Sequence, residues 1–174
     1  DLENNVIDVT RTTNYTTVFR LRPVTGTAAE PVIIRNNIVN LQCNADYSYC
    51  FDFDNTDSEH IYFAHNTAKC SGSGLCGNLF VEKSWENLWV YNNLFVNETS
   101  GYVFRFNSDS GNRFCDYNRV SFTGSNVGII AGTDCATLAD WTAASGFDAH
   151  SALCTPQFVG NNDLHVTDSD GITV

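Results

Sequence analysis

Four of the most hydrophobic segments of this chain each carry an asparagine at the same place, between two apolar stretches. These asparagines follow one another at intervals of 29, 27 and 25 residues. A repeat of about 20 to 50 residues that is built from short apolar strands is typical of a solenoid, in which each coil buries its apolar face against its neighbours. The segments are VIIRNNIVN around Asn37, IYFAHNTAK around Asn66, LWVYNNLFV around Asn93 and RFCDYNRVSF around Asn118.

Apolar residues recur three positions before and two positions after these asparagines, and another apolar row precedes them at similar intervals. We expect all three rows to point into the core. The surrounding strands are rich in Val, Ile, Phe, Tyr and Trp and contain no interior proline, which favours β structure over helix. Each period is therefore expected to hold a strand, a bend and another strand, preceded by a further strand. The inward rows are Ile34, Phe63, Val90 and Cys115; Val39, Ala68, Phe95 and Val120; and Phe19, Phe51, Phe80, Phe104 and Ile129.

The four asparagines are expected at sharp corners between strands. A corner residue must tolerate left-handed backbone geometry, which asparagine does better than any residue except glycine. Its amide can also bond the same amide one coil away, at about 4.8 Å, so Asn37, Asn66, Asn93 and Asn118 are predicted to form a structural ladder. A row of amides that binds a glycan or a metal ion is the alternative.

One segment has a helical signature. Thr137 can cap its start, Asp140 stands three residues later in a capping-box position, and Gly146 can end it. The sequence therefore predicts an all-β solenoid with one short helix near residues 137–146.

Seven cysteines lie mostly in polar, loop-like segments. Three local disulfides are the simplest arrangement, and they would indicate an oxidising, extracellular setting, although the connectivity does not follow from sequence. Zinc is the alternative, but no CxxC motif is present and the histidines are not spaced with the cysteines. Cys115 falls in an inward row and is expected to be a buried thiol. The expected pairs are Cys43 with Cys50, Cys70 with Cys76, and Cys135 with Cys154.

Two N-x-[ST] triplets begin at Asn14 and Asn97 and fit a secreted glycoprotein. The net charge of −11 argues against nucleic acid as a partner, because no cluster of Lys and Arg is present to bind phosphate. It fits a soluble surface, a cation or a neutral glycan. No apolar run approaches the roughly 20 residues of a membrane span. The chain contains no methionine and begins at Asp1, so we expect a processed form or a sequence recorded without its beginning.

The tail combines a Tyr-Asn strand, a Trp-bearing helix, a G-x-D-x-H-S motif, a Pro-x-Phe-Val strand and an Asp-Leu-His-Val strand. With the periodic asparagines, it resembles the C-terminal coils of secreted proteins in the right-handed parallel β-helix superfamily, the pectate-lyase-like fold. The resemblance covers roughly residues 17–170 and is most specific over 113–168. It departs at the ends, where such proteins have more coils and an N-terminal capping helix. The motif residues are Tyr117, Asn118, Trp141, Gly146, Asp148, His150, Ser151, Pro156, Phe158, Val159, Asp163, Leu164, His165 and Val166.

The resemblance implies a right-handed parallel β-helix, and the length allows about five to six coils. We expect one domain over 1–174, in which residues 1–16 supply an extra or donated strand and 134–174 form the last coil and tail. Without a cap, exposed sheet edges invite another strand. The chain is then either the C-terminal part of a longer protein or a subunit that stacks end to end into a filament.

Active members of the superfamily are mostly polysaccharide lyases or hydrolases, which need close carboxylates or a base with a charge clamp. The sequence offers such groups on the outward face of the first strand row. We favour the alternative, in which these groups form a ladder of mixed charges that stabilises the sheet by roughly 0.2–1 kcal/mol per pair. The carboxylate candidates are Asp52, Asp54 and Glu82, and the base and clamp candidates are Lys83 and Arg105.

The other polar motif residues are expected to be structural. His150 and His165 should bond loop carbonyls, and Asp148 and Asp163 should be turn residues. No cofactor and no metal site are predicted, although the DSD stretch at 168–170 could hold Ca²⁺ weakly.

Our first functional hypothesis is a secreted, non-catalytic structural module, such as a fibre subunit or surface scaffold that associates with its own copies. The alternatives are the C-terminal part of a polysaccharide lyase or hydrolase, and a glycan-binding module. Trp85, Trp89 and Trp141 are the tryptophans available for a sugar-stacking platform, and only an exposed Trp85 or Tyr91 was expected to serve it.

Overall fold

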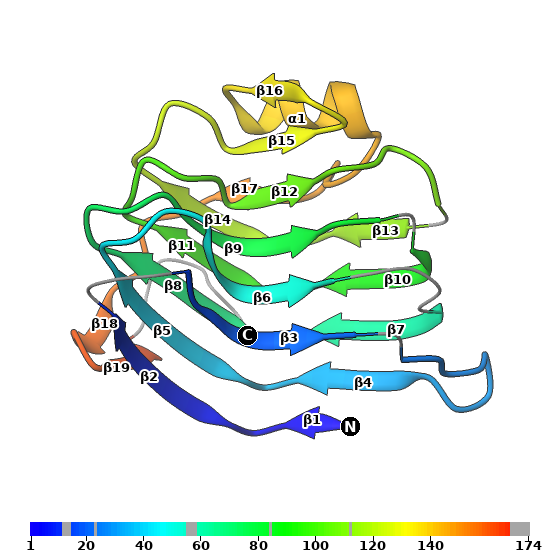
Figure 1. Cartoon of the computed structure of the whole chain (residues 1–174), viewed down its shortest axis with the longest axis horizontal. Helices are drawn as coiled ribbons and strands as arrows, with labels where there is room; N and C mark the ends of the chain where they lie inside the picture. Colours follow the sequence, from blue (N-terminus) through cyan, green and yellow to red (C-terminus); the bar gives the residue numbers. More distant parts are fainter. Residues whose placement is uncertain (12–14, 23, 55–58, 84, 112, 168–174) are drawn as a thin grey trace.

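The computed structural model describes residues 1–11, 15–22, 24–54, 59–83, 85–111 and 113–167. In it the chain is a parallel β-solenoid of about four turns with one short helix (Figure 1). Each full turn adds one strand to each of three parallel sheets, which we call A, B and C. The chain passes through them in that order before the next turn begins.

The three sheets contain five, six and six strands. Sheet A consists of β1 (Leu2–Glu3), β4 (Val32–Arg35), β7 (Glu59–Ala64), β10 (Glu86–Tyr91) and β13 (Arg113–Asp116). Sheet B consists of β2 (Val6–Arg11), β5 (Ile38–Cys43), β8 (Thr67–Ser71), β11 (Leu94–Asn97), β14 (Arg119–Phe122) and β17 (Ala152–Leu153). Sheet C consists of β3 (Thr17–Leu21), β6 (Ser48–Phe53), β9 (Cys76–Val81), β12 (Phe104–Phe106), β15 (Gly128–Ile130) and the antiparallel β16 (Thr133–Cys135).

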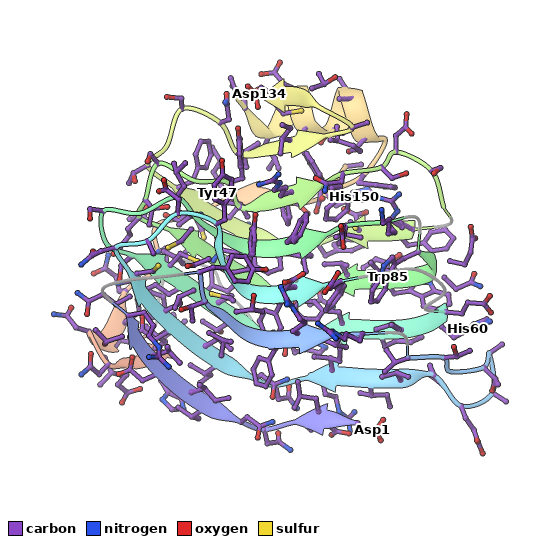
Figure 2. All side chains as sticks on the ribbon, viewed as in Figure 1. Asp1, Tyr47, His60, Trp85, Asp134 and His150 are labelled. Atoms are coloured by element: carbon purple, nitrogen blue, oxygen red, sulfur yellow. The ribbon has the colours of Figure 1, made fainter. Side chains whose placement is uncertain are left out.

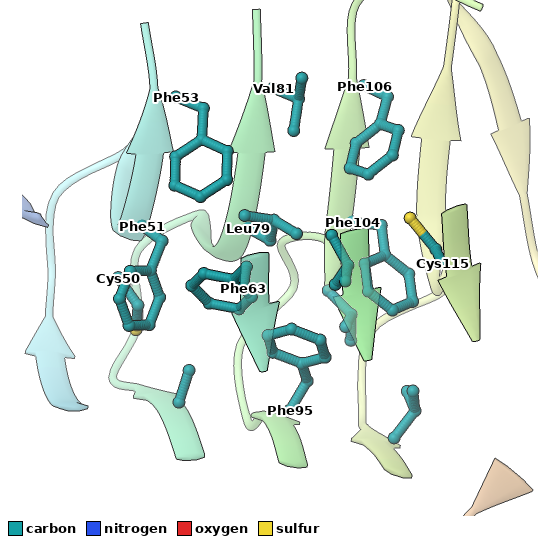
Figure 3. Close-up of a cluster of buried hydrophobic side chains, with 14 of the residues drawn as sticks. Cys50, Phe51, Phe53, Phe63, Leu79, Val81, Phe95, Phe104, Phe106 and Cys115 are labelled. Carbon is teal, nitrogen blue, oxygen red and sulfur yellow. The ribbon is translucent and has the colours of Figure 1, made fainter. Parts of the chain in front are cut away.

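The apolar rows predicted for sheets A and B are confirmed. Ile34, Phe63, Val90 and Cys115 lie directly over one another in sheet A, and all are buried. The corresponding row in sheet B is buried and in register as well; its members are Val39, Ala68, Phe95 and Val120. Figure 3 shows Phe63 and Phe95 of these rows among side chains of sheet C inside the solenoid. Phe51 and Phe63 make an edge-to-face contact there, with ring centroids 4.7 Å apart.

The row predicted for sheet C is wrong at two positions. Phe104 lies over Leu79, whereas Phe80 lies between Asp52 and Arg105 on the outward face. Ile129 pairs with Arg105 and is also on that face. Three adjacent apolar residues, 79–81, give no alternation that distinguishes the two faces, and a shift of one residue moves every side chain to the other side.

A ladder of side-chain amides runs between sheets A and B. Asn37 donates its Nδ2 hydrogen to Oδ1 of Asn66 at 2.9 Å, and the same contact joins Asn66 to Asn93 and Asn93 to Asn118, each at 3.1 Å. Asn5 adds a rung at 2.8 Å. The Oδ1 atom of each successive asparagine also accepts the backbone N–H of the asparagine one turn before it. The ladder therefore satisfies buried backbone groups at every bend.

Left-handed backbone geometry occurs one residue earlier than the sequence predicts. Each ladder asparagine has an ordinary φ value and is directly preceded by a residue with φ between 54° and 58°. This explains the asparagine doublets, because the first member adopts the left-handed conformation and the second forms the rung. The residues in the left-handed position are Asn4, Asn36, His65, Asn92 and Tyr117.

The predicted helix is α1 (Leu138–Ser145), with the predicted capping box. Thr137 Oγ1 accepts the backbone N–H of Asp140 at 3.1 Å, and Asp140 Oδ2 accepts the backbone N–H of Thr137 at 2.9 Å. Gly146 ends the helix with φ of 75°. The helix brings Trp141 against the core, where its ring stacks on Phe104 at 5.0 Å.

The predicted disulfides are absent, since all seven cysteines are free thiols. Cys43, Cys50, Cys70, Cys76 and Cys135 are buried in the core instead of closing surface loops. The Sγ atoms of Cys50 and Cys70 lie 3.4 Å apart, which is well beyond the S–S bond length of about 2.05 Å. Cys154, the expected partner of Cys135, is half-buried and forms no disulfide. The predicted disulfides do not form because the cysteine side chains of these strands point inward and contact residues of other turns.

The two ends of the solenoid differ (Figure 1). One end is covered by α1 and the antiparallel pair β15–β16, and Gly128 there leaves room for the Trp141 ring. At the other end, β1, β2 and β3 each pair with a single strand among the described residues. Beside sheet B, β18 (Phe158–Gly160) and β19 (Asp163–Val166) form an antiparallel hairpin. The described residues include no helix long and apolar enough to span a membrane.

Candidate functional site

The outward face of sheet C carries the groups that the sequence predicts for chemistry. Strands β3, β6, β9 and β12 place Arg20, Asp52, Phe80 and Arg105 in one line, each over the next. Parallel pairing in register produces this line, because equivalent positions of successive strands share a face. The aromatic Phe80 thus separates the carboxylate from Arg105.

Asp52 is held by a network of donors. Its Oδ2 atom accepts hydrogen bonds from Tyr15 Oη at 2.8 Å, Thr17 Oγ1 at 3.2 Å and Arg20 Nε at 3.0 Å. The residue is only 1% exposed, so a substrate cannot reach it without displacing these partners. Burial is also the first cause of the raised pKa of Tyr15, whose hydroxyl faces this carboxylate.

The other predicted groups lie at or beyond strand ends. Asp54 follows β6 and forms ion pairs with Arg20 at 3.6 Å and Arg22 at 3.9 Å. Glu82 and Lys83 follow β9, and the backbone N–H of Glu82 donates to the carbonyl of Phe53. The two carboxylates of Asp52 and Asp54 therefore meet at Arg20, which forms an ion pair with each.

Arg105 lies among aromatic rings. It donates Nη1–H to Tyr49 Oη at 2.9 Å, and its guanidinium lies 5.2 Å from the Phe80 ring centre and 5.7 Å from that of Tyr47. Tyr47 is exposed (Figure 2). A cavity of about 30 Å³ opens beside these groups, with room for little more than a water molecule. Its lining residues are Tyr47, Tyr49, Leu75, Cys76, Gly77, Gly101, Tyr102 and Arg105.

Tyr49 does not offer a general base at neutral pH. Burial raises the pKa of Tyr49 to about 12, even though Arg105 opposes the rise, so the hydroxyl stays protonated. A base must be available near the working pH and within reach of the proton it removes. The arrangement is that of a hydrogen-bonded and cation–π network that stabilises the sheet.

The polar residues of the tail hold the last turn in place. Asp148 is buried and accepts hydrogen bonds from Asn118 Nδ2, Trp141 Nε1 and Ser151 Oγ. Burial raises the pKa of Asp148 although these bonds oppose it. The amide ladder therefore ends on a carboxylate that also anchors the helix.

The two tail histidines contact carboxylates instead of the predicted loop carbonyls. His150 Nδ1 lies 2.6 Å from Asp116 Oδ2, and its ring stacks on Tyr117 at 5.0 Å (Figure 2). Burial raises the pKa of Asp116, but the hydrogen bonds from His150 and from the backbone outweigh it and leave this pKa lowered. His165 Nδ1 lies 2.5 Å from Asp163 Oδ1.

Of the two predicted glycosylation sites, Asn14 lies outside the described residues. Asn97 is fully buried, and its Nδ2 group donates to the carbonyls of Cys76 and Tyr102, each at 2.9 Å. Its Oδ1 atom accepts from Thr99. The fold thus uses this amide completely and leaves no room for a glycan on it.

Within the described ranges, no group of three or more His, Cys, Asp or Glu side chains could hold a metal ion. The predicted DSD stretch at 168–170 lies outside those ranges.

Of the aromatic residues considered for sugar stacking, Trp85 and Trp141 are fully buried, and Tyr91 is half-buried. Trp89 is half-buried on the outward face of sheet A, in a stack of rings that the sequence reasoning did not identify. The sequence signal for this stack is that Tyr62, Trp89 and Phe114 occupy equivalent positions in successive strands. Only a correct alignment of the strands of sheet A reveals it.

Comparison with known protein families, with curated proteins and with solved structures finds no significant match to this chain.

Proposed function

We propose that this chain is a non-catalytic structural β-solenoid module that joins a second copy through its open N-terminal end. The observation that carries this proposal is the difference in burial between the first turn and the next. Val9 and Phe19 are half-buried, whereas Leu41 and Phe51, their partners in the following turn, are 0% exposed. Apolar core residues therefore face solvent at this end, where burial in a dimer would stabilise them.

The exposed strand edges support the same contact. β1, β2 and β3 present backbone groups that a second molecule can pair with. Two copies that meet by these ends form a closed, two-fold interface, whereas a fibre needs a second interface on each copy. Because α1 and β16 cover the opposite end, end-to-end stacking into a longer fibre is the less favoured form of this proposal.

The lack of catalysis is inferred from the state of the predicted carboxylates. Asp52 and Asp54 are engaged by arginines, and Phe80 separates Asp52 from Arg105. A polysaccharide lyase or hydrolase is the alternative. Release of unsaturated uronate from pectate or alginate, with or without Ca²⁺, would overturn the non-catalytic proposal.

The finer fold assignment belongs to this proposal as well. A right-handed winding is supported by the strong preference of parallel crossover connections for that hand. Counting the incomplete turns at both ends gives about five to six coils in a single domain over 1–174. We place the protein outside the cell, and this rests on its resemblance to secreted β-helix proteins.

Size-exclusion chromatography with light scattering tests the contact. We expect twice the mass of one chain, and Val9→Lys, which puts a charge on the open core, should give the mass of a single chain. Val6→Lys is the matched control because Val6 is on the same strand and 68% exposed on the outward face. A wild-type mass of one chain at all concentrations overturns the proposal, as does a dimer that survives Val9→Lys in folded protein.

A further inference from the structure

The outward face of sheet A carries an apolar row that the proposed dimer contact does not use. Ile33, Tyr62, Trp89 and Phe114 lie over one another on β4, β7, β10 and β13. Tyr62 is 43% exposed and Phe114 is 41% exposed. The rings stack, with centroids 4.7 Å apart between Tyr62 and Trp89 and 5.9 Å apart between Trp89 and Phe114.

Stacking of this kind stabilises the sheet and by itself requires no ligand. A second feature at one end of the row points to one. The neighbouring outward column reads Arg35, Ala64, Tyr91 and Asp116, so that alanine is the single small residue between two large ones. A pocket of about 350 Å³ lies here, lined by Ala64 and Tyr62 among others. That volume falls in the range of small-molecule sites, about 300–1,000 Å³.

The pocket combines apolar and polar surfaces. Ile33, Ala64 and the Tyr62 ring supply apolar contact, and Pro31 completes the lining with Arg35 and His65. The Arg35 guanidinium is held by an ion pair from Nε to Glu3 Oε2 at 2.8 Å.

The second polar group is fixed by the backbone. His65 is the exposed residue in the left-handed corner position, with φ of 56°, directly before a ladder asparagine. Its backbone N–H donates to the carbonyl of Tyr91. Both polar side chains therefore project from backbone positions that the solenoid determines, which lowers the entropy cost of binding.

A ligand that fits this pocket has one apolar face and several hydroxyl groups, as a pyranose ring has. The net charge of −11 disfavours a polyanion. The row continues from the pocket over four strands spaced about 4.8 Å apart, so it extends roughly 14 Å, longer than one ring. We propose that this face binds a neutral polysaccharide, with one sugar ring in the pocket beside Tyr62 and the chain running across the edges of the stacked Trp89 and Phe114 rings.

Affinity electrophoresis in gels that contain xyloglucan, mixed-linkage β-glucan or galactomannan tests the proposal. We expect retarded migration in at least one of these gels. Trp89→Ala should weaken binding about tenfold, the effect of losing one ring contact. Ala64→Leu places a larger side chain in the pocket without removing any contact and should weaken the retardation. Tyr47→Ala is the matched control, because Tyr47 is 56% exposed but lies beside sheet C, and it should leave binding unchanged.

Absence of retardation in all three gels overturns the proposal. So does retardation that survives both Trp89→Ala and Ala64→Leu, or that Tyr47→Ala abolishes equally. Stronger retardation by pectate or alginate overturns the assignment of a neutral ligand. Circular dichroism confirms that each variant is folded, and light scattering of the same samples separates loss of sugar binding from loss of the dimer.

Discussion

At the scale of single residues, the asparagine side chains form hydrogen bonds with backbone groups that the strands leave unpaired at the bends. A bend between two parallel sheets leaves N–H and C=O groups that no strand can pair, and an unpaired buried group costs about 1–3 kcal/mol. Asn66 satisfies several of them at once. Its Nδ2 donates to the carbonyls of Ile34 and Ala64, and its Oδ1 accepts the backbone N–H of Asn37.

Asn66→Ala should lower the free energy of unfolding by about 2–5 kcal/mol, because it leaves these buried groups without partners. Urea denaturation followed by circular dichroism measures the loss. Asn5→Ala is the control, because this rung lies at the open end and is half-buried, so its loss should be about 1 kcal/mol or less. Equal losses for the two variants would contradict a role for the ladder in satisfying buried groups.

At the scale of elements, α1 closes one end of the core. The helix is short, and its local signals only make it possible: a capping box at Thr137 and Asp140 and a left-handed Gly146. What holds it in place is Trp141, which is 0% exposed, stacks on Phe104 and donates Nε1–H to Asp148 at 2.9 Å. Tertiary contacts of this kind supply most of the stability of a helix of this length.

Two substitutions in α1 should therefore differ in effect. Trp141→Ala removes the ring that covers the end of the core and should cost about 3–5 kcal/mol of unfolding free energy. Thr137→Ala removes only the cap and should cost about 1 kcal/mol. Thermal and urea unfolding measure the two losses. If the cap substitution costs as much unfolding free energy as the tryptophan substitution, the contact of Trp141 with the core is not what mainly holds the helix.

At the scale of the whole molecule, the solenoid buries most of its cysteine side chains. Six of the seven cysteines are buried, and Cys154 alone is half-buried. Burial raises the pKa of Cys70 and Cys115 well above the ordinary value, and it raises that of Cys76 and Cys135. The thiolate is the reactive form, so burial and the raised pKa both protect these thiols.

Folded protein treated with iodoacetamide at pH 8 should therefore be alkylated first at Cys154, and at the other six only as fast as the chain unfolds. Mass spectrometry of peptides measures the order of labelling. In denaturant all seven should react, which serves as the control. Rapid labelling of several cysteines in the folded state would contradict the described core, and a pair that resists labelling in denaturant would indicate a disulfide.

The sequence by itself determined the features that repeat or are local. The period of the asparagines indicates a solenoid, and the inward rows of sheets A and B follow from it, because every turn must bury the same positions against the next. The helix was predictable because its capping signals lie within ten residues of one another.

Tertiary structure decided the features that depend on register between turns of unequal length. It put Leu79 in the core position predicted for Phe80, and it placed Phe80 on the outside, between Asp52 and Arg105. It also brought Cys50 to Cys70 instead of Cys43, and left one end of the core open while α1 closed the other. These contacts join residues about 20 or more positions apart in different turns, where no local pattern sets the alignment.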